Sequence, residues 1–311
     1  MSSTRFTLHL ADLDWQVLAF EAVEAIGRPT RITLELVSSR ADLELNGLLR
    51  QPARLTLDEG RALHGLVWGI EQTHCTPQLS RYRLELRPAL AWLAQRRNCR
   101  IFEQLSVPRI LEQLLAEHGL LGDRCRFALT GHYPPRDYCV QYAESDLHFL
   151  QRLCEEEGLH YHFQHHPEQG QVLVFGDDQS VFPRLEPNQP YRPDSGQPRQ
   201  QPVIQRFAEG LESRSDTLTL HAYDDQQPCL PLHGSAWAGE AATPSAELYD
   251  YPGRFTERAR GRQLARRALE AVRRDRRRAE GAGTQPLLAS GQFFELEGHP
   301  RADCNQLWLV S

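Results

Sequence analysis

Apolar and polar residues alternate along much of the first ninety residues. The runs 6–10, 32–37, 55–57 and 82–87 each place apolar side chains at every second position. This period of two indicates half-buried β-strands, in which successive side chains point to opposite faces of a sheet. Several such strands in succession, separated by turns such as residues 58–60, predict an antiparallel barrel or sandwich.

The period changes to that of a helix after residue 105. Ser106 is placed to cap a first helix, Pro108 suits its first turn and Gly119 suits a left-handed cap at its end. A second helix is predicted to begin near Ser145 and to end at Gly158. The sequence therefore predicts a small α+β region after the first group of strands.

The remainder of the chain returns to strand patterns after a segment that favours turns. Residues 177–202 hold many Pro, Gln, Asp and Gly residues, which is typical of a linker. A long Arg-rich helix with a narrow apolar face is predicted over residues 255–279. The further predicted strands cover residues 203–207, 218–223, 292–296 and 307–310.

Composition narrows the class of protein. Hydrophobic residues make up 40% and charged residues 24% of the 311, which predicts a folded, soluble protein. The net charge of -6 argues against a nucleic-acid binder, and all 35 basic residues are arginines. No apolar run is long enough to span a bilayer, and the first ten residues do not resemble a signal peptide. The seven cysteines, an odd number without a C-x-x-C pair, predict free thiols in a reducing compartment.

Histidines supply the densest cluster of candidate metal ligands. The cluster consists of His160, His162, His165 and His166. His160 and His162 share one face of a predicted strand and could bind zinc or nickel there. Because Leu159, Tyr161 and Phe163 occupy the other face and suit the core, we favour the interpretation that both histidines face solvent. His165 and His166 then begin the following turn.

Two charged segments are also candidates for interactions. Glu155, Glu156 and Glu157 lie at the end of the second helix, where negative charge opposes the helix dipole. We interpret them as exposed charges of little consequence, with contacts to arginine side chains of a partner as the alternative. The Arg-rich helix contains acidic residues and no aromatic residue that could stack on a base, which favours a solvated face or a subunit contact over nucleic-acid binding. Its arginines are Arg258, Arg260, Arg262, Arg266, Arg267, Arg273, Arg274, Arg276, Arg277 and Arg278.

The sequence contains no G-x-S-x-G, H-E-x-x-H or P-loop motif. Gly281-Ala282-Gly283 lacks the third glycine of a dinucleotide-binding fingerprint. We therefore expect no catalytic, cofactor-binding or metal-binding residue and no enzymatic activity.

Several stretches, in a fixed order, resemble the valine-glycine-repeat (VgrG) spike family of type VI secretion. The most specific is the strand-helix-strand segment 138–163, and further similar segments are 63–67, 100–103, 106–111, 288–296 and His299-Pro300. The resemblance covers nearly the whole chain.

The resemblance implies a mainly β fold of the contractile phage tail-hub type, with two related β-barrels and a small α+β region. On this basis residues 1–92 form the first hub barrel, 93–176 the α+β region, 177–202 the linker and 203–311 the second barrel with the Arg-rich helix. The chain has no segment that resembles the family's narrow spike, and we expect it to be truncated before that part.

The resemblance also implies a structural role and a set of partners. Three copies would form a ring with pseudo-sixfold symmetry that joins a hexameric inner tube and the baseplate to the puncturing spike. A tip protein and effectors would dock through the absent C-terminal part, and neither nucleic acid nor a membrane segment is involved. The protein would assemble in the cytoplasm and be delivered outside the cell without a signal peptide.

Three alternatives remain open on the sequence. The first is a hub of a phage tail or of a phage-derived injection particle, which requires the same architecture. The second is a hydrolase or metal-dependent enzyme that uses the histidines of residues 160–166. The third is a nucleic-acid binder that uses the Arg-rich helix.

Overall fold

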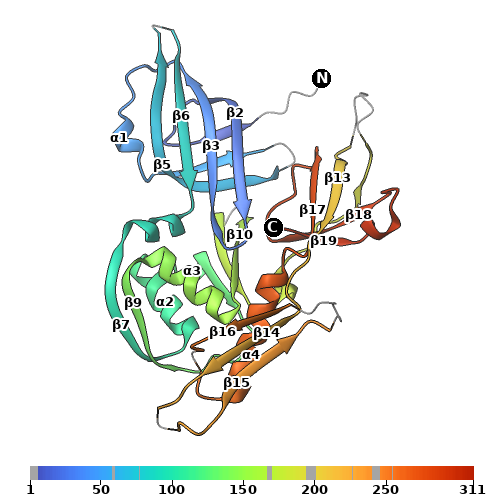
Figure 1. Ribbon diagram of the computed structural model, residues 1–311. Helices are drawn as coiled ribbons and strands as arrows, with labels where there is room; N and C mark the ends of the chain where they lie inside the picture. The colour runs from blue at the N-terminus through green and yellow to red at the C-terminus, as the bar shows by residue number, and fades with distance from the viewer. Residues whose placement is uncertain are drawn as a thin grey trace.

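The computed structural model describes residues 6–57, 60–76, 78–166, 170–193, 201–225, 227–239, 246–253 and 255–311. Two residues of the turn expected at 58–60, and residues 194–200 of the expected linker, lie outside the described residues. The chain forms four packed units, each with its own cluster of buried apolar side chains. Figure 1 shows the first barrel at one end of the molecule, with the α+β unit below it and the C-terminal strands to one side.

Six antiparallel strands close the N-terminal barrel in the order β1-β2-β3-β6-β5-β4. Their bounds are β1 Thr7–His9, β2 Gln16–Ala25, β3 Arg28–Ser38, β4 Pro52–Thr56, β5 Ala62–Cys75 and β6 Ser80–Arg87, with the short helix α1 Leu45–Leu48 between β3 and β4. Alternate residues point inward, and Leu34, Leu55 and Leu84 are completely buried. The barrel predicted from the period of two is confirmed.

The α+β unit packs two helices against two small sheets, β7-β9 and β10-β11-β8. Its elements are η2 Ala89–Gln95, β7 Arg97–Leu105, α2 Val107–Glu117, η3 Gly122–Arg124, β8 Cys125–Ala128, β9 Arg136–Ser145, α3 Asp146–Glu157, β10 His160–His166 and β11 Gly170–Gly176. Both helices begin and end where the sequence predicts. Ser145 caps α3 by accepting the His148 N–H, and Gly158 ends it with a φ of 71°. Ser106 precedes α2 without a side-chain capping bond.

A third unit combines short segments of the predicted linker with strands that follow it and with the end of the chain. Its elements are η4 Gln179–Val181, β12 Gln189–Pro190, β13 Ile204–Leu211, β17 Arg277–Gly283, β18 Gln292–Glu297, η5 Ala302–Cys304 and β19 Leu307–Val310. The described strands form two small sheets, β12-β18-β19 and β13-β17, which share one core and do not close into a ring. Because β12 pairs with β18, the first part of the expected linker belongs to this unit.

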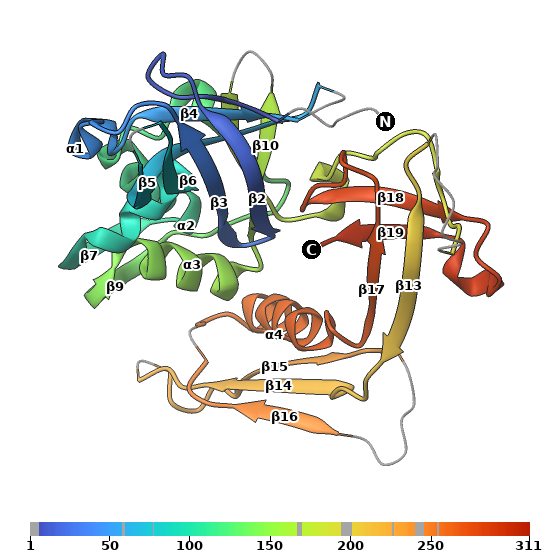
Figure 2. The same ribbon diagram turned by 90° about the horizontal axis from the view of Figure 1, so that it is seen from above.

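The fourth unit is inserted between β13 and β17. It consists of β14 Thr217–Ala222, β15 Leu232–Trp237, β16 Glu247–Asp250 and α4 Arg258–Arg273. Figure 2 shows α4 lying across one face of the three-stranded sheet. The Arg-rich helix ends at Arg273 and not at residue 279 as predicted, because residues from Arg277 onward pair with β13 as strand β17. The sequence pattern did not reveal this insertion as a separate unit.

Candidate functional site

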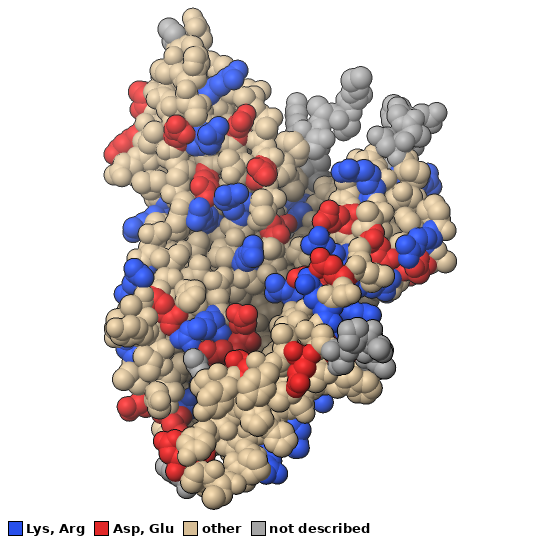
Figure 3. Space-filling view, in the orientation of Figure 1, with Lys and Arg blue, Asp and Glu red and all other residues tan. Residues whose placement is uncertain are grey.

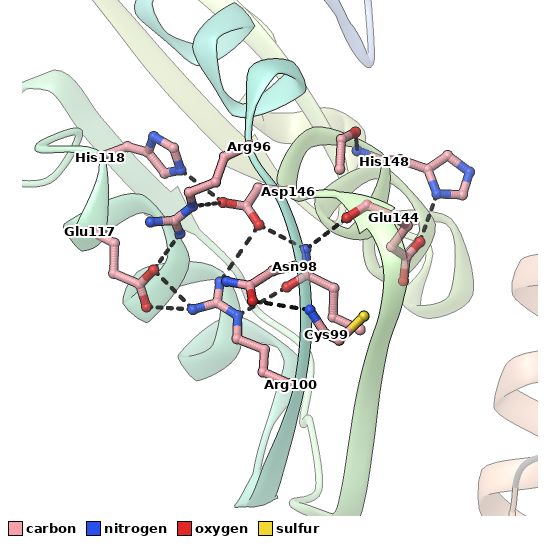
Figure 4. Close-up of polar contacts among 11 residues, drawn as sticks. Arg96, Asn98, Cys99, Arg100, Glu117, His118, Glu144, Asp146 and His148 are labelled. Carbon is pink, nitrogen blue, oxygen red and sulfur yellow. Dashed lines mark hydrogen bonds and ion pairs between the residues drawn. The ribbon is translucent and has the colours of Figure 1, made fainter.

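An extended polar network lies inside the α+β unit and is centred on Asp146. This residue is the first of α3, directly after the cap Ser145, and its side chain is fully buried. Figure 4 shows Arg96, Arg100, Glu117 and His118 around it. Arg100 belongs to β7 and Glu117 to α2, while Arg96 directly follows η2 and His118 directly follows α2. An isolated buried carboxylate is very unfavourable, so its partners decide whether the network is stable.

Asp146 is bonded on both carboxylate oxygens. Gln141 Nε2 donates to Oδ1 at 2.7 Å, while His118 Nε2 lies 2.9 Å from Oδ2 and the Arg96 guanidinium also bonds Oδ2. Arg96 and Arg100 both pair with Glu117 at the end of α2. The network therefore ties β9 and the start of β7 to the end of α2 and the start of α3.

The electrostatics of Asp146 favour the charged form. Burial alone would raise its pKa, but the hydrogen bonds from Gln141, His118 and Arg96 outweigh burial and hold the pKa below its ordinary value. A carboxylate of this kind is a structural anion, because a general acid or base needs a pKa near the working pH and access to a substrate. The contacts of Asp146 therefore serve to hold the α+β unit rigid.

A second buried carboxylate joins the α+β unit to the inserted unit. Only 2% of the Glu157 side chain is exposed, and it pairs with Arg136 at 2.6 Å and with Arg260 of α4. Glu156 also pairs with Arg136, at 2.7 Å. The interpretation as exposed charges of little consequence was wrong for Glu156 and Glu157, which contact arginines of the same chain and not of a partner, while Glu155 is exposed. Arg260 accordingly lies in an internal contact within the chain.

His160 and His162 do not face solvent as predicted. His162 is 1% exposed, and its ring lies 5.1 Å from that of Phe182, while the His160 ring lies 4.5 Å from Phe182. One face of β10 packs against the α+β core, and the other is covered by the third unit at His162, while His160 is half-buried. The prediction failed because an alternating strand cannot reveal whether another unit covers its second face.

His165 lies between β10 and the first barrel. Its Nδ1 accepts the backbone N–H of His64 at 3.2 Å, and the two rings stack with centroids 5.8 Å apart. Burial lowers the pKa of His165 to about 3, and nearby Arg61 and His64 contribute to that shift. Burial also lowers the pKa of His162, to about 4. Both side chains are therefore neutral at physiological pH.

In the described part of the chain, one group of side chains has its potential ligand atoms close enough together to hold a metal ion. It consists of Glu209, Asp303 and Cys304 in the third unit. Glu209 already pairs with Arg277 and Arg301, and Asp303 pairs with Arg301. A cation there would have to displace arginines, so the donor set does not fit a metal. The candidate ligands His160, His162, His165 and His166 are not brought together in such a group.

Exposed apolar side chains mark two surfaces that could contact other proteins. On the outer face of β9, Tyr138 and Tyr142 are 70% and 78% exposed, and Ile101 of the paired strand β7 is 62% exposed. On the inserted sheet, Trp237 and Tyr249 are 64% and 62% exposed. Large exposed aromatics of this kind are enriched at protein interfaces.

Charged residues do not form a surface of one sign on the face that Figure 3 shows, where arginines and acidic residues are interspersed. Among the described residues, no helix is long and apolar enough to cross a membrane.

Sequence reasoning missed Asp146, Glu157 and the packing of His162. An acidic residue in the first turn of a helix is common for electrostatic reasons, so Asp146 gave no signal of burial. The available signal was the series of acidic and arginine residues around the two helices, which have no fixed spacing.

The fold thus combines a closed barrel, an α+β unit with buried ion pairs and a further β unit. The chain belongs to the phage tail baseplate hub (GPD) family, whose model matches residues 23–311. This confirms the resemblance and the mainly β fold that it implied.

Curated relatives are type VI secretion spike proteins of Pseudomonas aeruginosa. The chain is 52% identical to VgrG4b over 100% of its own length and 39% of that relative. It is 47% identical to VgrG5 over 100% of its own length and 40% of that protein. The chain thus spans about two fifths of the length of these relatives.

A solved structure supports the fold independently. The c3393 protein of E. coli, described as a type VI secretion component with similarity to the phage T4 tail proteins gp27 and gp5, superposes with a TM-score of 0.75 at 22% identity. The match covers 98% of this chain and 70% of that one.

Proposed function

We propose that this chain forms the structural hub of a type VI secretion spike, as a homotrimeric ring that joins the hexameric inner tube to the puncturing spike. The observation that carries the proposal is the 52% identity to a curated spike protein along the whole chain. The structure is consistent with a rigid building block, because its buried carboxylates are neutralised by arginines within the chain.

The proposal includes the absence of enzymatic activity in these residues. The buried titratable groups Asp146, Glu157 and His165 bond other groups of the protein, and Glu157 and His165 join one unit to another. Delivery to the outside of the cell, without a signal peptide and after assembly in the cytoplasm, follows from the same role. The tip protein and effectors would be carried by residues beyond those matched here.

The proposal is tested by the contact with the inner tube. The purified chain is mixed with the hexameric tube protein of its own secretion cluster and imaged by negative-stain microscopy. We expect ring-shaped particles with one tube hexamer stacked on a threefold ring. If the two proteins remain separate at micromolar concentrations, with a folded chain, the hub proposal is contradicted.

The hub of a phage tail is the second candidate, favoured by the description of the matched family. The same imaging separates the two roles. Stacking on a phage tube protein from the same genome, and not on the secretion tube protein, would assign the chain to a phage tail or phage-derived particle.

A further inference from the structure

A cavity of about 530 Å³ lies between the first barrel and the α+β unit. Its lining includes apolar residues of the barrel, such as Leu8 and Leu66, and Ala89 at the start of the α+β unit. Arg54, His64 and Gln171 supply polar groups. The volume is within the range of sites that bind small ligands or short peptide segments.

The polar lining forms a row that crosses from one unit to the other. On the outer face of the barrel, His9, Arg54 and His64 are paired across β1, β4 and β5. In the α+β unit, His165 stacks on His64 and pairs with Gln171 across β10 and β11. Two sheets therefore present their polar side chains to one cavity.

Three nitrogen atoms of this row are buried without a hydrogen-bond partner. They are Arg54 Nε, His64 Nδ1 and Gln171 Nε2. Buried donors are almost always bonded in proteins, so three orphaned nitrogens at one cavity require an explanation. Arg54 Nε and Gln171 Nε2 are donors only, and His64 Nδ1 becomes one in the matching tautomer or when protonated.

The lining of the cavity carries positive charge, which, like its unbonded donors, favours an anionic ligand. Arg54 and Arg124 both line the cavity, and in the described part of the chain neither forms an ion pair. Most arginines of this chain's α+β unit, such as Arg96 and Arg136, are paired with carboxylates. One acid, Asp12, also lines the cavity, on an exposed loop.

We infer that this cavity binds a carboxylate carried on an apolar group, with Arg54, Gln171 and His64 bonding the carboxylate and the leucine side chains contacting the apolar part. Guanidinium and amide groups donate paired hydrogen bonds that suit the planar carboxylate. An acidic peptide segment of a partner and a small organic acid share this chemistry. The site lies outside the network around Asp146 and requires no assembly of the hub.

The test uses the 311-residue chain. Isothermal titration calorimetry measures binding of 4-phenylbutyrate and of the blocked peptide acetyl-Leu-Leu-Glu-amide. The neutral analogues 4-phenylbutyramide and acetyl-Leu-Leu-Gln-amide serve as matched ligands. Binding of the peptide alone assigns the site to a protein partner, and binding of phenylbutyrate alone assigns it to a small organic acid.

We expect each acid that binds to do so roughly tenfold or more tightly than its neutral analogue, because charge-assisted bonds are lost in the amide. Arg54→Gln should weaken binding by roughly tenfold or more for the same reason, while Arg83→Gln, an exposed arginine of the same barrel, leaves it unchanged. Gln171→Glu places a negative charge beside the bound carboxylate and should abolish binding. This second variant tests the site if Arg54→Gln does not fold.

The inference also has a spectroscopic readout. Burial, together with the nearby charge of Arg54, lowers the pKa of His64, and a bound carboxylate would counter that shift. The His64 ring signals should therefore titrate at higher pH in the presence of the acid. The site would be overturned if neither acid bound at concentrations up to roughly 10 mM. It would equally be overturned if the amides bound as tightly as the acids, or if Arg54→Gln and Gln171→Glu bound as tightly as the parent chain.

Discussion

At the scale of residues, the protein is held together by carboxylates buried among arginines. Asp146 and Glu157 are both nearly inaccessible, yet each is bonded by cationic or amide groups from other elements. Ion pairs on a protein surface contribute little, but removing one partner of a buried pair leaves an uncompensated charge. The consequence of a substitution therefore depends on burial far more than on charge.

Replacement of Asp146 tests this directly. Asp146→Ala removes the carboxylate that Arg96, His118 and Gln141 share, and we expect a loss of about 3–5 kcal/mol in the free energy of unfolding. Urea denaturation followed by circular dichroism measures it. Asp123→Asn, at an exposed position of the same unit, should stay within about 0.5 kcal/mol of the parent. Equal effects of the two variants would contradict the role assigned to Asp146.

The buried histidines predict a pH dependence of stability. The pKa values of His162 and His165 are lowered to about 4 and about 3, from 6.5 in an exposed state. At a pH between the lowered pKa and 6.5, the unfolded chain binds more protons than the folded chain. The free energy of unfolding therefore falls as the pH drops from about 7 toward 4, by up to about 1.4 kcal/mol per pH unit for each histidine. The pKa of Asp146 lies below 3.8, so its contribution is lost only at lower pH.

The groups that face these histidines are known from the structure. His160 and Arg126 lie near His162, and both oppose its protonation. Arg61, His64 and His166 oppose protonation of His165, whereas Glu24 lies 3.7 Å from its Nε2.

A matched pair of variants measures the histidine contribution. His162→Gln should reduce the slope of stability against pH between 7 and 4, and His74→Gln, at an exposed position of the barrel, should preserve it. Thermal unfolding across this pH range provides the measurement. An unchanged slope in His162→Gln would show that protonation of this side chain does not limit stability.

At the scale of elements, close backbone contacts fix the position of α4. A Cβ atom placed on Gly234 of β15 would lie 2.1 Å from the carbonyl carbon of Gly261 in α4. Such an approach requires glycine at position 234, whereas a Cβ atom on Gly261 would meet the ring of Phe255 at 2.4 Å. The Arg-rich helix is thus held by its narrow apolar face, which includes Ala265 and Leu269, and its arginines lie along the sides.

Gly234→Ala is expected to separate α4 from β15. The added methyl group meets backbone atoms, which cannot rotate away, so we expect a loss of about 1–3 kcal/mol in the free energy of unfolding. Gly69→Ala in β5 is the control, because a Cβ atom there has no neighbour within 4 Å. Chemical denaturation of both variants gives the comparison, and a neutral Gly234→Ala would disprove the close packing.

The elements were largely predictable because local patterns determine them. The barrel strands follow from alternation, and α3 follows from its Ser145 cap and from Gly158 at its end. The end of α4 was not predictable, since residues from Arg277 continue a sequence suited to a helix but pair with β13. The candidate site was also hidden, because burial of His162 and Glu157 depends on units that are distant in the sequence.

At the scale of the whole molecule, four units are joined by few but specific contacts. The backbone N–H of Gly27 bonds the carbonyl of Tyr161, which joins the barrel to the α+β unit. Arg61 of the barrel donates to the carbonyls of Pro286 and Leu288 in the third unit, at 2.9 and 2.7 Å. These contacts give the chain a fixed shape, which a subunit of a closed ring requires.

Two aromatic surfaces have no covering element in the described part of the chain. They lie on the outer face of β9, at Tyr138 and Tyr142, and on the inserted sheet, at Trp237 and Tyr249. If the chain is a subunit of a larger machine, surfaces of this kind are where its neighbours would bind.

The oligomeric state of the purified chain tests the central claim most directly. Light scattering combined with size-exclusion chromatography measures the mass in solution across a range of concentrations. The account predicts a particle of three times the 35.6 kDa chain, with threefold symmetry and a central opening in negative stain. A single 35.6 kDa species at every concentration would contradict the proposal that these residues form the ring of the hub.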